Sequence, residues 1–188
     1  MLTQQQKKRL PMMATTIRMA SAPVFFIALY VDKDWADWLA ALWFILMSLT
    51  DWLDGYWARI FDARTNLGKF MDPIADKVLV LSALLILLVQ KKVDPAMVAI
   101  LLSRDIFIGG IRSAAAADGL IIDAKATGKW KTAMQMVAIP CLYLSSLITI
   151  LPLQQLGYGL LWISVIFSIK SGFEYTMAYL KIRKEGPT

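Results

Sequence analysis

Four aspartates in the first half of the chain have the residue type and spacing to hold metal ions. Asp51 and Asp54 are three residues apart, and Asp72 and Asp76 are four residues apart. On helices, each spacing puts the two carboxylates of a pair on one face. The chain contains no histidine, and oxygen ligands alone select a hard cation such as Mg²⁺ or Mn²⁺. Four carboxylates can hold two such ions.

The composition indicates what kind of element must carry these aspartates. The 188 residues are 58% hydrophobic and 18% charged, whereas a soluble domain is about 45–50% apolar and about 25% charged. This balance excludes a disordered chain, a coiled coil and a polar secreted scaffold. One membrane span needs about 20 apolar residues, so the length allows about six spans. We therefore expect residues 1–188 to form a single all-α integral membrane domain.

Six apolar segments predict the transmembrane helices and put both termini on one side of the membrane. Charged turns separate the first four, which cover residues 11–31, 35–59, 70–90 and 95–117. Residues 132–169 carry no charge and are long enough for two more spans. Proline, glutamine and glycine at 152–157 predict the turn between these two.

The basic residues predict which side faces the cytoplasm. One side collects the basic juxtamembrane segment 1–10, the loop after the second span, the loop before the fifth and the C-terminal tail. We therefore expect both termini to be cytoplasmic. Lys125, Lys131 and the cations of the tail are interpreted as contacts to anionic lipid or as determinants of topology.

The predicted spans bring the two aspartate pairs to one depth. The second span ends near Arg59, so Asp54 and Asp51 lie about 8 and 12 Å inside its cytoplasmic end. The third span starts near Gly68, which puts the second pair at a similar depth. Taken singly, an aspartate here could be a helix cap or part of a turn. Four like charges at one depth need counter-charge, which favours the metal site.

Residues 51–76 resemble the signature of the CDP-alcohol phosphotransferase family at all eight of its fixed positions. The chain reads DWLDGYWAR, then eight residues, then GKFMDPIAD. The family pattern is DxxDGxxAR, eight residues, then GxxxDxxxD. The resemblance extends to the length of the chain and the number of spans. It implies an enzyme that transfers a substituted phosphate from a CDP-linked donor to an alcohol and releases CMP.

The resemblance also implies a role for each position of the signature. In the family the first three aspartates bind metal, and the last is both a ligand and the general base; here these are Asp51, Asp54, Asp72 and Asp76. The residues expected to contact the nucleotide-linked lipid are Gly55, Ala58, Arg59, Thr65 and Gly68. Gly55 and Ala58 lack bulk, so a nucleotide can approach closely, and Arg59 can offer a phosphate two parallel hydrogen bonds.

Further stretches resemble one branch of the family, the bacterial phosphatidylglycerolphosphate synthases. They are PMMATTIR, MDPIADKVLV, SRDIFIGGIR and GKWKT, at 11–18, 71–80, 103–112 and 128–132. The first is similar to PNxxTxxR, which adds Thr15 and Arg18 to the expected donor site, and Met12 stands where Asn is usual. This branch implies CDP-diacylglycerol as donor, glycerol 3-phosphate as acceptor, the bacterial cytoplasmic (inner) membrane as location and a homodimer as assembly.

Three basic residues outside the signature are candidates for binding the acceptor phosphate. Arg104 and Arg112 lie in the fourth span, and Lys129 lies at the start of the fifth. An intramembrane arginine is a functional candidate by default, although Arg104 could pair with Asp105, and Arg112 could extend to the interface. A cationic pocket suits glycerol 3-phosphate and repels choline or ethanolamine. Inositol phosphate would fit it equally, and phosphatidylglycerol is a third candidate acceptor.

Two other classes of membrane protein also use intramembrane aspartates. A cation transporter would place them along a path, whereas here they share one level. A prenyl-transfer enzyme also binds Mg²⁺ through aspartates, but its donor needs no Gly-x-x-Ala-Arg element. We expect membrane lipids as partners and no nucleic acid.

Overall fold

The computed structural model describes residues 20, 25, 34–60, 66–118, 120 and 126–185, without the side chains of 34, 51–60, 66–73, 184 and 185. Within these residues all regular structure is α-helical, which confirms the all-α fold class. The five long helices there are α3 (Asp34–Ile60), α4 (Asn66–Val89), α5 (Pro95–Ala117), α6 (Ala126–Leu144) and α7 (Leu153–Glu185). The predicted first span, 11–31, lies outside the described residues apart from residues 20 and 25.

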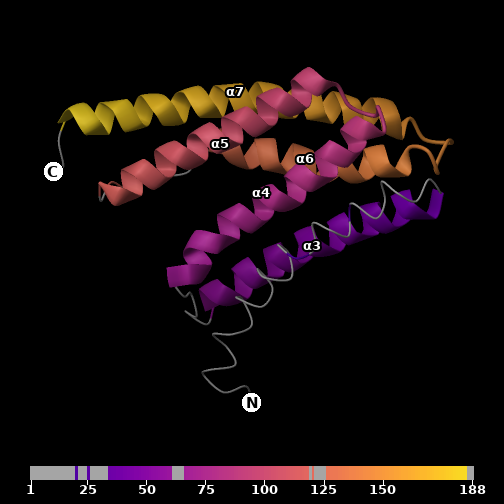
Figure 1. Cartoon of the computed structure of the whole chain (residues 1–188), viewed down its shortest axis with the longest axis horizontal. Helices are drawn as coiled ribbons and strands as arrows, with labels where there is room; N and C mark the ends of the chain where they lie inside the picture. Colours follow the sequence, from indigo (N-terminus) through magenta and orange to yellow (C-terminus); the bar gives the residue numbers. More distant parts are fainter. Residues whose placement is uncertain are drawn as a thin grey trace, which may run out of the picture.

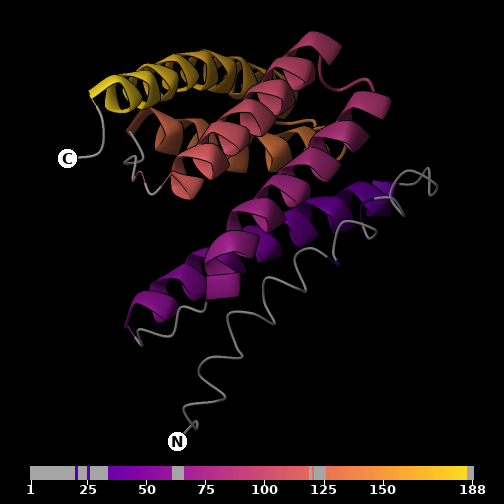
Figure 2. The ribbon, with the colours of Figure 1, turned by 60° about the vertical axis from the view of Figure 1, so that its left-hand side comes forward.

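The helices run back and forth, so that their ends gather at two ends of the molecule (Figure 1). The C-terminal ends of α3, α5 and α7 lie at the same end as the N-terminal ends of α4 and α6, as a second view also shows (Figure 2). This arrangement brings the aspartate-bearing parts of α3 and α4 to the same end as Arg112 of α5 and Lys129 of α6.

An apolar core joins all five helices. Its fully buried side chains include Phe44 of α3, Leu84 of α4, Met97 of α5, Leu142 of α6 and Leu161 of α7. The buried hydroxyl of Tyr143 on α6 donates a hydrogen bond of 3.0 Å to the carbonyl oxygen of Ala83 on α4. This bond satisfies a polar group that would otherwise weaken the packing.

A polar cluster fastens the end of the bundle that lies away from the aspartate pairs. One carboxylate oxygen of Asp37 on α3 accepts from Gln90 at 2.8 Å. The other accepts from Lys92 at 2.7 Å and from Ser146 at 2.9 Å. Because Lys92 follows α4 and Ser146 follows α6, the cluster ties α3 to two interhelical turns.

Three of the predicted spans are confirmed as helices close to their expected bounds. Predicted span 95–117 matches α5 at both ends, and the spans 35–59 and 70–90 correspond to α3 and α4. The start of α5 has a direct cause: the Asp94 side chain caps it by accepting from the Ala96 N–H at 2.7 Å, and proline is favoured at the first helical position.

The turn predicted at 152–157 is wrong, because α6 ends at Leu144 and α7 begins at Leu153. Pro152 therefore precedes the helix, where its missing N–H costs nothing. Gly157 lies inside α7 because that helix approaches α6 closely: a Cβ at this position would lie 2.7 Å from Cγ of Leu142. Lys181, Arg183 and Lys184 are also helical and do not form a separate tail.

One described helix is long and apolar enough to cross a membrane, namely α7 over Leu153–Arg183. Trp35–Thr50 of α3 forms a shorter apolar stretch.

The close approach of α6 and α7 predicts opposite effects for two glycines of one helix. We expect Gly157→Ala to lower the thermal unfolding midpoint in detergent micelles, because overpacking costs about 1–3 kcal/mol. Gly159→Ala is the matched control, since a Cβ there meets nothing within 4 Å. It should raise the midpoint slightly, because alanine favours a helix over glycine by about 1 kcal/mol. Equal midpoints for the two variants would contradict the tight contact.

Candidate active site

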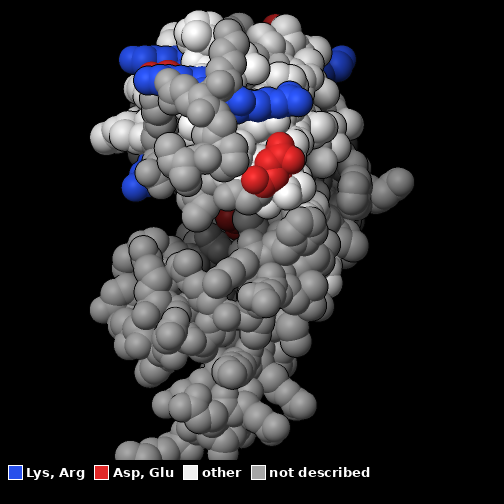
Figure 3. All heavy atoms as spheres, turned by 90° about the vertical axis from the view of Figure 1, so that its left-hand side faces the viewer, with Lys and Arg blue, Asp and Glu red and all other residues white. Residues whose placement is uncertain are grey.

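A cavity of about 520 Å³ lies among α4, α5, α6 and α7. Five basic side chains and two carboxylates line it: Lys77, Arg104, Arg112, Lys129, Lys131, Asp76 and Asp105. The excess of positive charge suits an anion that carries more than one negative charge. The cavity thus unites Asp76 with the three cations that the sequence proposed for the acceptor. Figure 3 shows the molecule from the end where the C-terminal ends of α5 and α7 lie, and basic side chains are visible across the described part of it.

The remaining predicted site residues lie outside the side chains that the structure describes. Those on described helices are Asp51, Asp54, Gly55, Ala58 and Arg59 of α3 and Gly68 and Asp72 of α4. Met12, Thr15, Arg18 and Thr65 lie outside the described residues altogether. Their contacts with donor and metal stay predictions.

The described helices put the four aspartate positions at similar distances from neighbouring helix ends. Asp54 and Asp51 precede the end of α3 at Ile60, and Asp72 and Asp76 follow the start of α4. At about 1.5 Å per residue, the four positions lie about 9 to 15 Å from these helix ends. Because α3 and α4 lie side by side (Figures 1 and 2), the two pairs belong to one region of the bundle.

The donor set of this region fits a hard divalent cation. Its ligand atoms would all be carboxylate oxygens, which Mg²⁺ and Mn²⁺ prefer. Among the described side chains no three metal-binding groups gather, since Asp76 is the only one of the four whose side chain is described. The Asp76 side chain is half-buried and lines the cavity, so the cavity adjoins the predicted metal site.

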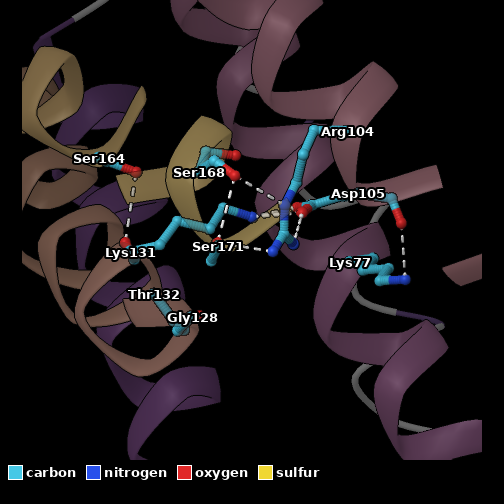
Figure 4. Close-up of polar contacts among 9 residues, drawn as sticks. All are labelled: Lys77, Arg104, Asp105, Gly128, Lys131, Thr132, Ser164, Ser168 and Ser171. Carbon is cyan, nitrogen blue, oxygen red and sulfur yellow. Dashed lines mark hydrogen bonds and ion pairs between the residues drawn. The ribbon is translucent and has the colours of Figure 1, made fainter. Parts of the chain in front are cut away.

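Asp105 on α5 forms ion pairs with Arg104, its neighbour on the same helix, and with Lys131 on α6 (Figure 4). Both of its carboxylate oxygens accept from Nζ of Lys131 on α6. One of them also accepts from Nη1 of Arg104 at 3.0 Å. Arg104 reaches α7 as well, donating to the Ser168 carbonyl oxygen at 3.1 Å and to Oγ of Ser171 at 2.7 Å. This network fastens three helices around the cavity.

The network corrects the interpretation of Lys131 as a lipid contact or a determinant of topology. Its side chain is buried, at 4% exposure, and is bound to Asp105. The physical reason is the start of α6 at Ala126, which places Lys131 inside a packed helix and not in a loop. Lys125 lies outside the described residues.

The three predicted acceptor cations differ in their surroundings. Arg104 makes the pair with Asp105 that the sequence left open, so three of its five N–H groups are engaged by described residues. Arg112 is exposed, and its guanidinium carbon lies 5.6 Å from the centre of the Tyr175 ring, within cation–π range. Lys129 is exposed and lines the cavity. Arg112 and Lys129 are therefore the better placed to meet a ligand entering from outside.

Sequence reasoning missed several residues that line the cavity, among them Lys77, Asp105, Gln135, Ser171 and Tyr175. Lys77 donates to the Asp105 carbonyl oxygen at 3.0 Å. Gly109 leaves room for this side chain, because a Cβ at that position would lie 2.7 Å from Nζ of Lys77. Lys77 and Asp105 directly follow Asp76 and Arg104 in the chain and lie in the stretches 71–80 and 103–112 that resemble one branch of the family. These were the signals available from the sequence.

Comparison with known proteins identifies the family. The family model described as CDP-alcohol phosphatidyltransferase matches residues 8–170. The chain belongs to this family. A protein of Bacillus subtilis (strain 168) named "CDP-diacylglycerol--glycerol-3-phosphate 3-phosphatidyltransferase" is 40% identical over 182 residues, which cover 88% of this chain and 92% of that protein. A protein of the same name from Rickettsia bellii (strain RML369-C) is 35% identical over 175 residues, 93% and 97% of the two chains. The family predicted from residues 51–76 is confirmed.

The Asp105–Lys131 pair predicts a specific pattern of stability. Asp105→Asn should lower the free energy of unfolding by about 3–5 kcal/mol, because it leaves Lys131 buried without a carboxylate partner. Lys131→Met should lower it by less, because Asp105 keeps its ion pair with Arg104. The double variant should lose less than the sum, with a coupling of about 0.5–3 kcal/mol. Denaturant unfolding in mixed micelles measures all three. Asp118→Asn, at the exposed end of α5, is the control and should change little. Additive losses would show that the pair contributes nothing.

Proposed function

We propose that this protein transfers the phosphatidyl group of CDP-diacylglycerol to glycerol 3-phosphate, giving phosphatidylglycerol phosphate and CMP. The observation that carries the proposal is the cavity that joins Asp76 to five basic side chains. A phosphorylated acceptor needs cationic groups for its phosphate and a base within reach of its hydroxyl, and this cavity contains both kinds of group. Membership of the family and the names of the relatives support the same reaction.

The proposed setting is the bacterial cytoplasmic membrane, with six spans, both termini in the cytoplasm and the cavity opening to that side. Large apolar side chains on the outside of the bundle support it: Ile106, Ile166 and Phe173 are 75%, 65% and 68% exposed, and a soluble surface rarely tolerates such patches. α7 has 33 residues, about 50 Å, so its basic C-terminal part would extend beyond a core of about 30 Å. We also expect residues 1–188 to be one domain and to form homodimers.

The proposed cofactor is a pair of Mg²⁺ or Mn²⁺ ions held by Asp51, Asp54, Asp72 and Asp76. Bound divalent ions neutralise a diphosphate and stabilise the leaving group. The donor contacts assigned by family resemblance are those of Thr15, Arg18, Gly55, Ala58, Arg59, Thr65 and Gly68. Asp76, the proposed ligand whose side chain the structure describes, lines the cavity, and we assign it as the carboxylate that reaches both substrates.

In the proposed reaction, Asp76 accepts the proton from the primary hydroxyl of glycerol 3-phosphate. The hydroxyl oxygen then forms a bond to the phosphorus of the phosphatidyl group. The bond from that phosphorus to the oxygen shared with CMP breaks, and CMP leaves with the electron pair. Arg112 and Lys129 hold the acceptor phosphate. Arg104 adds positive charge to the same cavity, and its contacts with Asp105 and α7 fix its position.

The acceptor assignment predicts a selective assay result. Purified protein in mixed micelles with CDP-diacylglycerol and Mg²⁺ should release CMP with glycerol 3-phosphate, and not with inositol phosphate or phosphatidylglycerol. Excess chelator should abolish the release, and Mg²⁺ or Mn²⁺ should restore it. Asp76→Asn is the control for background and should bind donor but not turn over, because it cannot take the proton.

Two outcomes of this assay would overturn parts of the proposal. Release of CMP with another acceptor alone would replace glycerol 3-phosphate. Full activity in excess chelator would remove the metal ions.

The cavity also predicts a split between the two substrates for Arg112→Ala. A hydrogen bond to a charged group contributes about 1.5–3 kcal/mol, so the apparent KM for glycerol 3-phosphate should rise roughly 10- to 150-fold. The KM for CDP-diacylglycerol should change little, and Arg112→Lys should restore binding only in part. Arg183→Ala, an exposed cation on α7 that does not line the cavity, is the matched control. A selective loss for CDP-diacylglycerol would move Arg112 into the donor site.

A further inference from the structure

Gln135 on α6 lines the cavity, and its Nε2 has no hydrogen-bond partner in the described part of the chain. Its side chain is 2% exposed and lines the cavity. Four buried side-chain atoms lack a hydrogen-bond partner in the described part of the chain: Trp43 Nε1, Gln90 Oε1, Gln135 Nε2 and Ser168 Oγ. Of these four residues, only Gln135 contributes to the cavity wall. A buried donor without a partner destabilises a fold, so Nε2 of Gln135 is a candidate to donate to a ligand in the cavity.

Other polar groups that line the cavity are already engaged with one another. Lys131, one turn earlier on the same face of α6, is bound to Asp105. The Ser171 hydroxyl accepts from Arg104 and donates to the Ser168 carbonyl oxygen at 3.2 Å. Nε2 of Gln135 is therefore a neutral donor at the cavity that the described residues do not satisfy.

The position of Gln135 along α6 separates it from the phosphate-binding cations. It follows Lys129 by six residues, which is about 9 Å further along the helix and away from the cationic end. Val80, Ile108 and Met136 also line the cavity, so its wall includes apolar side chains as well as charged ones. A carboxamide can both donate to and accept from a hydroxyl, and it carries no charge that would favour a second phosphate.

We infer that Gln135 is a specificity-determining residue that binds the secondary hydroxyl of the acceptor, an inference that rests on the proposed function. The cations hold the phosphate, the primary hydroxyl faces Asp76, and the hydroxyl on the middle carbon binds the carboxamide. The cavity therefore selects a phosphorylated polyol over a phosphorylated simple alcohol. The selection arises because an acceptor without that hydroxyl leaves the buried amide unpaired.

The test compares the wild-type protein with one variant on two acceptors, glycerol 3-phosphate and one analogue. 3-Hydroxypropyl phosphate has the phosphate and the primary hydroxyl of glycerol 3-phosphate but lacks the secondary hydroxyl. The wild-type protein should use this analogue with a kcat/KM about tenfold lower. Gln135→Leu should lower kcat/KM for glycerol 3-phosphate by a similar factor and leave that for the analogue nearly unchanged. Gln155→Leu, an exposed glutamine of α7 outside the cavity, is the matched control and should change neither value.

The thermal unfolding midpoint of the protein without substrate distinguishes a binding role of Gln135 from a structural role. Gln135→Leu should match or exceed the wild-type midpoint, because it removes a buried donor without a partner. A lower midpoint with equal losses for both substrates would overturn the inference. So would an unchanged preference for glycerol 3-phosphate over the analogue. If the wild-type protein releases no CMP with glycerol 3-phosphate, the proposed function fails first and the inference falls with it.

Discussion

The pairing of buried charge is the constraint on which this structure depends. Helices that are apolar outside and closely packed inside cannot hold an isolated ion. Asp105 meets that constraint by binding Lys131 and Arg104 at once, and Arg104 extends the network to Ser168 and Ser171 on α7. The same bonds that neutralise the charges therefore set the distances among α5, α6 and α7. The cavity wall follows from these distances.

The two ends of the bundle use polar groups differently. At the end away from the aspartate pairs, Asp37 is satisfied by Gln90, Lys92 and Ser146, and this cluster holds α3 and two turns together. At the cavity, basic side chains outnumber carboxylates, and the buried Nε2 of Gln135 has no hydrogen-bond partner among the described residues. The first arrangement satisfies both oxygens of the Asp37 carboxylate, whereas the second has an excess of positive charge that suits an anion. Because the Asp37 cluster holds the helices together at one end of the bundle, they can position a site at the other end.

Small residues make these close contacts possible without providing chemistry themselves. Gly157 lets α7 approach Leu142 on α6, and Gly109 leaves room for Nζ of Lys77. A Cβ at Gly172 would lie 3.4 Å from Cγ of Arg104, so this glycine too permits the crossing of α5 and α7. Side chains at these positions would push helices or cations away from the cavity. The glycines thus contribute to the site through the space that they leave.

The sequence by itself determined the all-α class, the bounds of α5, the approximate bounds of α3 and α4, and the family, through the signature at 51–76. These features are local: apolar runs set helix extents, Asp94 and Pro95 start a helix, and a fixed spacing of aspartates belongs to one stretch of chain. The sequence also proposed Arg104, Arg112 and Lys129 for the acceptor, and these line the cavity together with Asp76. Only the tertiary structure decided that Lys131 binds Asp105, that Gln135 lines the cavity, and that the last break between helices comes before Leu153. Each of these depends on how a helix is rotated and how near its neighbour lies, which residue order alone does not specify, because the partners are distant in the chain.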